Sequence, residues 1–313
     1  KLNILSLIVY QIKIYRLIKK IDPDIIHCYN ELGILYYLFL LLNRKKIVLT
    51  VHDPITHSGW GNFMTTLRRK LSFFTINKHI LLNRMQTQEY KEKYKRNEKD
   101  IYFSALSIYE SLKCYGKTSD ERTLKLREAK VHKFNILFFG RIFLYKGVDY
   151  LMKAFEELQE EGINDVSLTV AGAGEYYFDV SKYKNNSNIN IINKVLPHEE
   201  LNGIIEESSI VVCPYIDATQ SGVIMTAFAF NIPVIATDVG GLKEMIDDGK
   251  TGILIPPRNV EAIKYAIKLM YENPKLLKQM SQNITDEWRI GKRSWDSITD
   301  GLVEIYNDII YNK

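Results

Sequence analysis

The stretch SGVIMTAFAFNIPVIATDVGG, residues 221–241, decides how the fold of this chain is interpreted. It predicts a helix that opens at Ser221-Gly222, a turn at Asn231 and a buried strand from Pro233 to Thr237. The Gly-Gly pair at 240–241 then leads into another helix. We therefore expect two helix N-termini to face one crevice at the carboxyl end of a strand. Backbone N–H groups and the helix dipole favour a bound phosphate at such a place.

A second stretch with phosphate chemistry lies upstream, in Gly140-Arg141 and Lys146-Gly147. It follows a predicted strand at 135–139 and precedes a predicted helix at 148–158. The glycine lets the chain turn off the strand, Arg141 offers a planar pair of donors to phosphate oxygens, and Lys146 adds a point charge. Two solvated charges beside a turn are the alternative interpretation.

Polar groups at the start of the helix that follows Ser221 extend the predicted site. We expect the N–H groups of Ser221 and Gly222 to face a second phosphate, and the side chains of Gln220 and Ser221 to add donors. Thr226 lies one helical turn further on, where we expect it to reach a ribose or sugar hydroxyl. By contrast, Gly172-Ala173-Gly174 lacks the third glycine of a dinucleotide fingerprint and predicts only a tight turn.

Helices and strands alternate along the whole chain. With 313 residues, of which 46% are hydrophobic and 25% charged, the composition is that of a globular protein of two domains. The alternation predicts parallel sheets with crossover helices. The predicted strands are 24–28, 46–51, 79–82, 135–139, 166–171, 189–192, 210–213 and 233–237, and the predicted helices besides those above are 4–20, 32–42, 67–74, 86–95, 198–208, 261–271, 274–283 and 294–310.

From Asn135 to about Tyr271 the chain resembles the donor-binding domain of the family 4 glycosyltransferases, which have the GT-B fold. The resemblance implies an α/β protein of two Rossmann-like domains with a cleft between them. It also implies retaining transfer of a sugar from a nucleoside diphosphate, UDP or GDP, to an acceptor held by the first domain, without metal or cofactor. The matching pieces are Gly-Arg with Lys-Gly five residues later, Val-Ala-Gly-Ala-Gly, Leu201 to Tyr215, Pro-Val-Ile-Ala-Thr-Asp-Val-Gly-Gly-Leu-Lys-Glu, and Asp-Gly-Lys-Thr-Gly-Ile-Leu at 248–254.

The resemblance also implies roles for individual residues. It places the diphosphate on Arg141 and Lys146, and the nucleotide base near Asn193–Leu196. Thr50-Val51-His52-Asp53 resembles the family's Thr-x-His-Asp site, whose histidine lies beside the transferred sugar; an ordinary loop histidine is the alternative. The candidate catalytic residues are His52, Arg141 and Lys146, the acceptor-side candidates are His52 and His57, and the donor-binding candidates are Gly140, Arg141, Lys146, Lys194, Leu196, Asp217, Gln220, Ser221, Gly222, Val223 and Thr226.

The sequence departs from the family at the pair of glutamates that the family carries across this turn, with seven residues between them. Aligned on Gly222-Val223, those positions are Ala218 and Thr226, so both carboxylates are lost. Asp217 lies one residue from the first of them, and Gln220 is an alternative contact for the sugar. The chain is therefore a variant branch of the family or a catalytically inactive paralogue.

The opening elements also differ from the family. A complete first domain begins with a strand, a glycine-rich turn and further strand–helix units before the segment that corresponds to Asp22-Pro23-Asp24. We therefore expect the natural N-terminus to lie upstream of Lys1, with roughly fifty to eighty residues missing. A first-domain sheet that lacks strands is the alternative.

Charge is distributed unevenly along the chain, whose net charge is +5. Residues 1–118 hold 20 Lys and Arg against 9 Asp and Glu, a net +11, and the remainder holds 22 against 28, a net −6. A basic first half predicts peripheral contact with an anionic membrane, and a solvated basic face is the alternative. We expect no nucleic-acid partner because no recognition motif accompanies the charge.

The longest apolar run and the three cysteines indicate where in the cell the protein is expected. The eleven residues Leu32–Leu42 are too short a run to span a bilayer, which needs about 20, so we interpret them as a core helix rather than a membrane-dipping segment. Cys28, Cys114 and Cys213 form no Cys-x-x-Cys motif, which favours a reducing cytoplasm, and no metal-ligand spacing occurs. We expect a cytoplasmic protein, with the inner face of the membrane as a further location.

These observations predict an acceptor-side domain at residues 1–118, a donor domain at 119–288, and a C-terminal helix at 289–313 that returns to the first domain. The predicted function is transfer of a sugar (hexosyltransferase type) to a saccharide, lipid-linked in our interpretation, during synthesis of a surface polysaccharide. A non-catalytic nucleotide-sugar-binding paralogue or partner subunit is the alternative. A dehydrogenase is disfavoured because the third glycine and the ribose-binding acid are absent.

Overall fold

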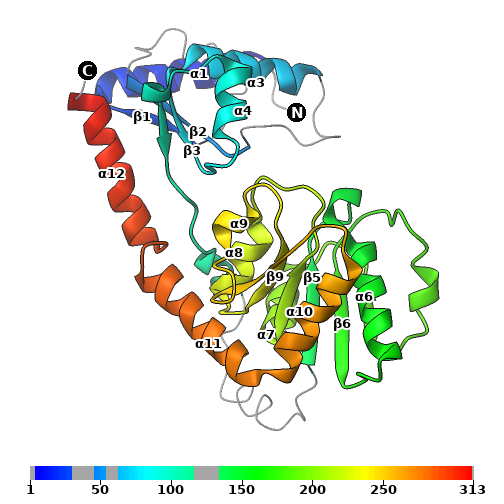
Figure 1. The fold of residues 1–313 in the computed structure, drawn as a ribbon. Helices are drawn as coiled ribbons and strands as arrows, with labels where there is room; N and C mark the ends of the chain where they lie inside the picture. The colour runs from blue at the N-terminus through cyan, green and yellow to red at the C-terminus, as the bar shows by residue number, and fades with distance from the viewer. Residues whose placement is uncertain (1–3, 30–45, 54–62, 116–133, 312–313) are drawn as a thin grey trace. The chain divides into compact units, whose positions relative to one another are not determined.

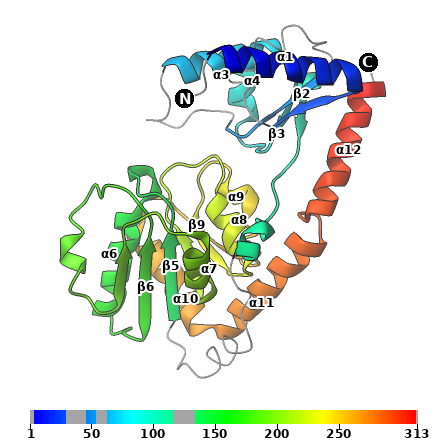
Figure 2. The ribbon, with the colours of Figure 1, turned by 180° about the vertical axis from the view of Figure 1, so that it is seen from behind.

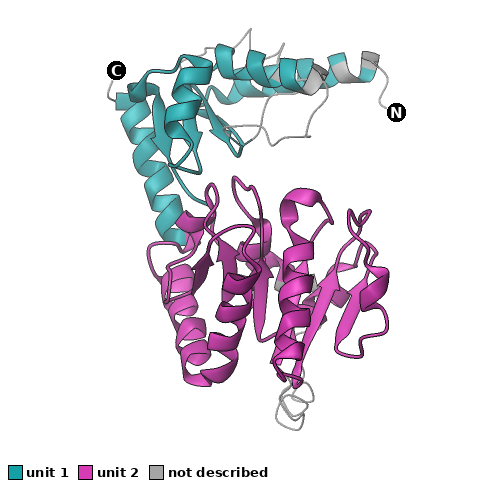
Figure 3. Cartoon of the chain, turned by 45° about the vertical axis from the view of Figure 1, so that its right-hand side comes forward, with its two compact units in different colours: residues 1–106, 296–313 teal, residues 107–295 magenta. Residues whose placement is uncertain are grey.

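The computed structural model describes residues 4–29, 46–53, 63–115 and 134–311. The chain divides into two compact units (Figure 3). Unit 1 comprises Lys1–Leu106 and Asp296–Lys313, and unit 2 comprises Ser107–Trp295. The structural boundary therefore precedes the expected one at 118. Residues 107–112 belong to unit 2 because they bond to it; for example, the Leu112 carbonyl accepts a 2.7 Å hydrogen bond from Asn202.

Unit 1 contains a parallel sheet of short strands in the order β1-β2-β3-β4 (Figure 1). Helices α1, α3 and α4 contribute to a core on one face of this sheet, and α12 packs on the other. The strands are β1 (Ile26–Cys28), β2 (Ile47–Val51), β3 (Lys78–Leu81) and β4 (Ile101–Phe103), and the helices are α1 (Ile4–Ile21), α3 (Phe63–Thr75), α4 (Thr87–Tyr94) and α12 (Trp295–Tyr311).

Aromatic packing holds α3 and α4 against this sheet. Phe73 of α3 is fully buried and meets the rings of Tyr90 and Tyr94 edge-on at centroid distances of 5.6 and 4.8 Å. Burial of such a side chain stabilises a fold by about 1.5–3 kcal/mol. The Tyr90 hydroxyl lies 2.7 Å from Nδ1 of buried His79, and desolvation lowers the pKa of that histidine to about 3. His79 is thus a neutral core residue.

Unit 2 contains a parallel six-stranded sheet in the order β10-β9-β8-β5-β6-β7 (Figures 1 and 2). The chain adds β6 and β7 on one side of β5 and then returns to add β8, β9 and β10 on the other. The order therefore reverses between β5 and β8, which is a topological switch point. The strands are β5 (Phe134–Phe139), β6 (Val166–Ala171), β7 (Ile189–Ile192), β8 (Ile210–Cys213), β9 (Val234–Thr237) and β10 (Gly252–Ile255).

Crossover helices cover this sheet on both faces (Figure 2). Strands β8 and β9 are buried along their whole length, as expected for central strands of an α/β sheet. The helices are α6 (Val148–Glu160), α7 (His198–Glu206), α8 (Gly222–Ala229), α9 (Leu242–Met245), α10 (Val260–Glu272) and α11 (Pro274–Thr285), and a π-helical turn (Asp286–Ile290) follows α11.

Two expectations about helices need comment. The segment Leu32–Leu42 lies outside the described residues, so its interpretation as a core helix stays a prediction. Within the described part of the chain, none of the helices combines the length and the apolar character needed to cross a membrane.

Candidate functional site

The loops after β5 and β8 meet at the switch point of unit 2. The N–H of Ile216 donates to the carbonyl of Tyr145 at 2.7 Å. Gly147 adopts a left-handed conformation with φ of 62°, and a Cβ atom on it would lie 2.1 Å from the carbonyl oxygen of Pro214. The chain after β5 therefore packs closely against the chain at the end of β8. In open α/β sheets, ligands bind at the carboxyl ends of the strands at such a point.

The first turn of α8 belongs to the same place. A Cβ atom on Gly140 would lie 3.5 Å from Cγ2 of Val223, so the chain passes close to α8 as it leaves β5. The predicted donor residues Gly140, Gly222 and Val223 are thus brought together, although 82 positions separate Gly140 from Gly222 in the sequence.

Lys146 is the most unusual charged group of this site. Its Nζ lies 3.7 Å from the ring centroid of Tyr215 and 5.3 Å from that of Tyr145, which is the geometry of a cation–π interaction. Burial lowers the pKa of Lys146 from 10.5 to about 8. Tyr215 is fully buried beneath it. The site therefore holds a partly desolvated cation, whose charge an anionic ligand would stabilise.

Ser221 and Tyr215 form the floor beneath the start of α8. The Tyr215 hydroxyl lies 3.3 Å from the Ser221 hydroxyl, and both residues are buried. Ser221 makes no side-chain capping bond to α8. The N–H groups of the first turn are thus not satisfied by this residue, and the exposed Gly222 leaves them approachable. This arrangement supports the expected anion site at this helix terminus.

Thr226 forms a hydrogen bond within its own helix. Its hydroxyl donates to the carbonyl oxygen of Gly222 at 2.7 Å, and the side chain is buried within α8. The hydroxyl proton is therefore used inside the helix, and a contact of Thr226 with a ribose or sugar hydroxyl stays a prediction. Ala218, the other position at which the family carries a glutamate, is also buried.

The second expected helix N-terminus is present but belongs to a short helix. The chain does turn through Gly240-Gly241, but α9 is one turn of four residues, Leu242–Met245. The dipole of a helix grows with its aligned peptide units, so this short helix adds little to anion binding. The Gly240 backbone instead packs on Ala218, where a Cβ atom would lie 1.7 Å from the carbonyl oxygen. The helix predicted after Gly240-Gly241 is thus present, and of the two N-termini the one at α8 is the stronger candidate for anion binding.

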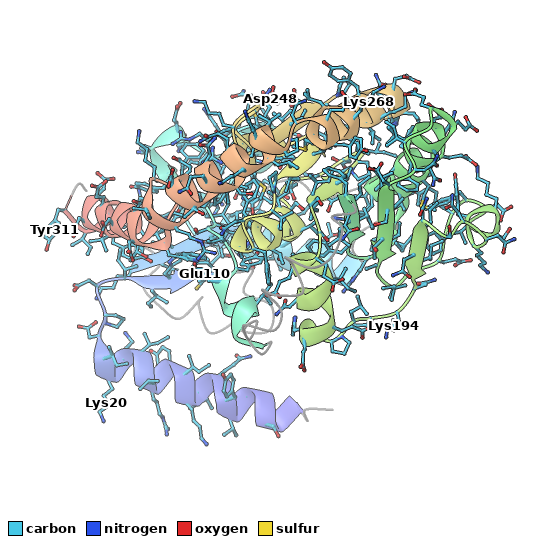
Figure 4. All side chains as sticks on the ribbon, turned by 90° about the horizontal axis from the view of Figure 1, so that it is seen from below. Lys20, Glu110, Lys194, Asp248, Lys268 and Tyr311 are labelled. Carbon is cyan, nitrogen blue, oxygen red and sulfur yellow. The ribbon has the colours of Figure 1, made fainter. Side chains whose placement is uncertain are left out.

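The remaining donor-side candidates differ in their exposure and in their bonding partners. Arg141 is exposed and forms no ion pair with any residue that the structure describes. Lys194, labelled in Figure 4, pairs with Glu200 at 2.9 Å. Asn193 is bonded through its side chain to both backbone groups of Gly174, which ties the loop after β7 to the loop after β6. Leu196, Asp217 and Gln220 are partly exposed.

Sequence reasoning missed two aromatic residues of the site. Tyr215 supplies the ring beneath Lys146, and Tyr109 lies on Gly222, where a Cβ atom would be 3.2 Å from the Tyr109 ring. Tyr215 stands directly after Cys213-Pro214 at the end of a predicted strand, a position that gives some signal. Tyr109 lies in the predicted first domain, residues 1–118, and far from Gly222 in the sequence, so no local pattern could have placed it.

Unit 1 carries the acceptor-side candidates. His52 directly follows β2, and its ring centroid lies 6.1 Å from that of Tyr29. Tyr29 in turn lies 4.9 Å from His27, whose ring nitrogens lie 2.6 Å from the Thr50 hydroxyl and 2.5 Å from the Tyr306 hydroxyl. His57 lies outside the described residues. Among residues with a described placement, no three His, Cys, Asp or Glu side chains could share a metal ion.

The lowered pKa of Lys146 predicts that anion binding weakens as pH rises through about 8. Only its charged form attracts a diphosphate, and the ligand-free protein loses that charge near pH 8. We expect the Kd for pyrophosphate, measured by calorimetry from about pH 7 to about pH 9, to rise more steeply than in Lys146→Arg, whose guanidinium stays charged. Parallel profiles in the two proteins would contradict this role for Lys146.

The same pKa shift acts on stability with the opposite sign. Between pH of about 8 and 10.5 the unfolded chain keeps a proton on this lysine that the folded chain has lost. The contribution of Lys146 to the free energy of unfolding therefore rises with pH across this window. Loss of binding above pH 8 is thus not explained by loss of folding at this residue.

Two family models match the chain. The model described as "Glycosyl transferases group 1" matches residues 120–287, and the model described as "Glycosyl transferase 4-like" matches residues 2–81. The first match covers more than half of the chain and contains all the loops of the unit 2 site. The second covers α1, β1, β2, α3 and β3 of unit 1.

Individual relatives agree with these matches. An uncharacterised glycosyltransferase of Haemophilus influenzae is 25% identical over 294 residues, which cover 88% of this chain and 78% of the relative. A solved glycosyltransferase from Rickettsia africae has a TM-score of 0.71 at 20% identity and covers 99% of this chain and 83% of its own. The Anabaena protein HepE, in complex with UDP-glucose, has a TM-score of 0.68 at 14% identity over 95% and 82%. These structural likenesses show the fold, which is GT-B.

Proposed function

Because the chain belongs to the group 1 glycosyl transferases, we propose that it is a retaining family 4 enzyme that transfers a hexose from a nucleoside-diphosphate sugar to a saccharide. The observation that carries the donor assignment is the position of Lys146. Its ammonium lies on Tyr215 at the switch point of unit 2, next to the start of α8. A diphosphate is the ligand that a desolvated cation and the N–H groups at a helix N-terminus would both stabilise.

We propose UDP or GDP as the nucleotide, with no further cofactor and no metal in the reaction. The complex of the structurally similar HepE with UDP-glucose supports a uridine nucleotide. In this proposal Arg141 and Lys146 contact the diphosphate, while Ser221, Gly222 and Val223 lie by the sugar. Lys194 and Leu196 lie on the side of the base, as the resemblance implies.

The chemistry that we propose needs few groups. The bond between the anomeric carbon and the diphosphate oxygen breaks, and the acceptor hydroxyl attacks that carbon from the same face. Its proton passes to the departing phosphate oxygen, so the products are the glycoside and the nucleoside diphosphate. Charge builds on the leaving phosphate, where Arg141, Lys146 and the α8 N-terminus would stabilise it. His52 would position the sugar, and Asp217 would replace part of the lost glutamate pair.

On the acceptor side we propose a lipid-linked saccharide in the synthesis of a surface polysaccharide. His52 and His57 are the candidate residues there, in the unit whose sequence is net basic. A basic surface would favour the anionic face of a membrane from which a lipid-linked acceptor projects. We place the reaction in the cytoplasm at that face.

A thermal-shift panel tests the donor assignment. The purified chain is melted with UDP, GDP, ADP, CMP and NAD, beside an Arg141→Ala/Lys146→Ala variant. Ligand at about 100 times its Kd should stabilise the protein by about 2.7 kcal/mol, and we expect this shift with one nucleoside diphosphate only. The double variant should melt normally without ligand and show no shift. A shift with NAD alone, or an equal shift in the variant, would overturn the assignment.

A non-catalytic nucleotide-sugar-binding protein is the second candidate. The observation that favours it is the loss of both glutamates, at Ala218 and at Thr226, whose hydroxyl is bonded within α8. The two functions differ in turnover. Release of nucleoside diphosphate from the sugar donor identified by the panel, in the presence of membrane extract as acceptor, supports the enzyme. Tight donor binding without release supports the binding protein.

A further inference from the structure

Two helices of unit 1 cover the same face of its sheet. Ile14 and Ile18 of α1 and Phe73 of α3 enter the same core cluster, and Figures 1 and 2 show both helices on one side of the strands. The opposite face of the sheet is covered by α12 through Ile309. The outer faces of α1 and α3 therefore point away from the sheet in the same layer.

The outer face of α1 mixes apolar and basic side chains. Val9, Ile12 and Leu17 are exposed by 45%, 45% and 55% of their surface. Lys13, Arg16 and Lys20 are exposed between them, and Figure 4 labels Lys20 near the C-terminal end of the helix. The 18 residues of α1 include no Asp or Glu. Apolar side chains interspersed with cations alone are typical of a helix that lies in a membrane interface.

Helix α3 repeats this pattern. Leu67, Leu71 and Phe74 follow one another at helical spacing and are exposed by 38%, 38% and 63%, with exposed Lys70 beside them. The 13 residues of α3 likewise include no Asp or Glu. Among the described residues, none forms an ion pair with Lys13, Arg16, Lys20 or Lys70. Their charge is therefore available to an anionic partner.

We propose that the outer faces of α1 and α3 bind a membrane that contains anionic lipid. The α1–α3 surface consists of Val9, Ile12, Lys13, Arg16, Leu17, Lys20, Leu67, Lys70, Leu71 and Phe74. Cations at the headgroup level attract anionic lipid while the apolar side chains enter the boundary with the acyl chains. This inference deepens the proposed function by naming the surface that would bring the enzyme to a lipid-linked acceptor.

Two other partners fit the α1–α3 surface less well. A second copy of the chain in a symmetric dimer would place this basic surface against itself, which like-charge repulsion disfavours. A nucleic acid would use the cations but would leave Leu17, Leu71 and Phe74 without an apolar environment. An anionic membrane satisfies both the charge and the apolar side chains.

Vesicle co-sedimentation tests the proposal without donor or acceptor. The full chain is mixed with vesicles of phosphatidylcholine alone, or with about one third phosphatidylglycerol. We expect binding to the anionic vesicles only, weakened by salt. A Lys13→Gln/Lys20→Gln/Lys70→Gln variant should bind about a hundredfold more weakly, from the usual contribution of each basic side chain. A Lys250→Gln/Lys275→Gln/Lys278→Gln variant in unit 2 has the same net charge of +2 and should bind as the parent does.

A second pair of variants distinguishes insertion of apolar side chains into the membrane from attraction between charges. Phe74→Ser should weaken vesicle binding at every salt concentration, whereas Tyr265→Ser, at an exposed position of α10, should not. Equal losses in both lysine variants would show a net-charge effect and overturn the proposal. So would dimerisation through the α1–α3 surface without vesicles, or binding to duplex DNA in place of vesicles. Because no step uses nucleotide, this result is independent of the thermal-shift panel.

Discussion

Replacement of Lys146 by alanine is expected to lower kcat/KM for the nucleotide-sugar donor by about 10²–10³-fold, the usual cost of removing one group that stabilises developing charge. The reason is the environment of its ammonium, which lies 3.7 Å from the Tyr215 ring centroid and is desolvated enough to lower its pKa to about 8. A cation in such a place interacts more strongly with a leaving diphosphate than one in water. The measurement is release of nucleoside diphosphate from the donor that the thermal-shift panel identifies.

The same variant should remain folded. Because the folded state disfavours the charged form of Lys146, its removal does not break a stabilising ion pair, and we expect Tm to change by only about a few degrees. Lys153→Ala is the matched control, since Lys153 is an exposed lysine on α6 in the same unit. A full loss of activity in Lys153→Ala, or near-normal activity in Lys146→Ala, would contradict the assigned role.

The local pattern of the sequence was sufficient to predict most elements of unit 2. Hydrophobic runs followed by a turn residue, Gly172, Asn193 or Pro214, predicted β6, β7 and β8 at their structural bounds. The GT-B fold was predicted as well, from the order of motifs rather than from any single one. Strands β6 and β8 are buried enough for local pattern and tertiary packing to agree.

Short elements were missed because their formation depends on neighbours. Strand β4 has three residues, Ile101–Phe103, and exists because its backbone pairs with β3. Strand β10, Gly252–Ile255, overlaps the motif at 248–254 that resembles the glycosyltransferase family. Only its pairing with β9 makes this segment a strand. The π-helical turn at Asp286–Ile290 has no sequence signal, and it places Trp288 against Phe228 of α8.

For the site, the sequence predicted the charged groups better than their surroundings. Arg141, Lys146 and Gly222 were named from spacing, and the structure brings their loops to one switch point. Spacing could not show that Thr226 turns its hydroxyl back onto Gly222, because either orientation suits a helix. It also could not show that a tyrosine ring lies beneath Lys146, since that contact depends on how β5 and β8 pair.

Replacement of Gly147 by alanine is expected to destabilise unit 2 by about 4 kcal/mol or more, in the range reserved for severe core or backbone changes. Two costs combine at this position. The residue has φ of 62°, which costs an alanine about 1–2 kcal/mol. In addition, the new Cβ atom would lie 2.1 Å from the Pro214 carbonyl oxygen, a backbone atom of the chain after β8 that cannot rotate away.

Gly162→Ala separates these two costs. Gly162 also has a positive φ, 89°, but nothing lies within 4 Å of its added Cβ atom, so only the conformational cost should remain. Urea unfolding followed by tryptophan fluorescence in a Trp60→Phe background reports on unit 2, which contains the other two tryptophans, Trp288 and Trp295. We expect a small decrease in midpoint for Gly162→Ala and a large one for Gly147→Ala. Equal decreases would mean that the loop after β5 moves away from Pro214 at little cost. The position of Lys146 over Tyr215 would then not be fixed by the backbone, and the proposed preorganised diphosphate site would lose its structural basis.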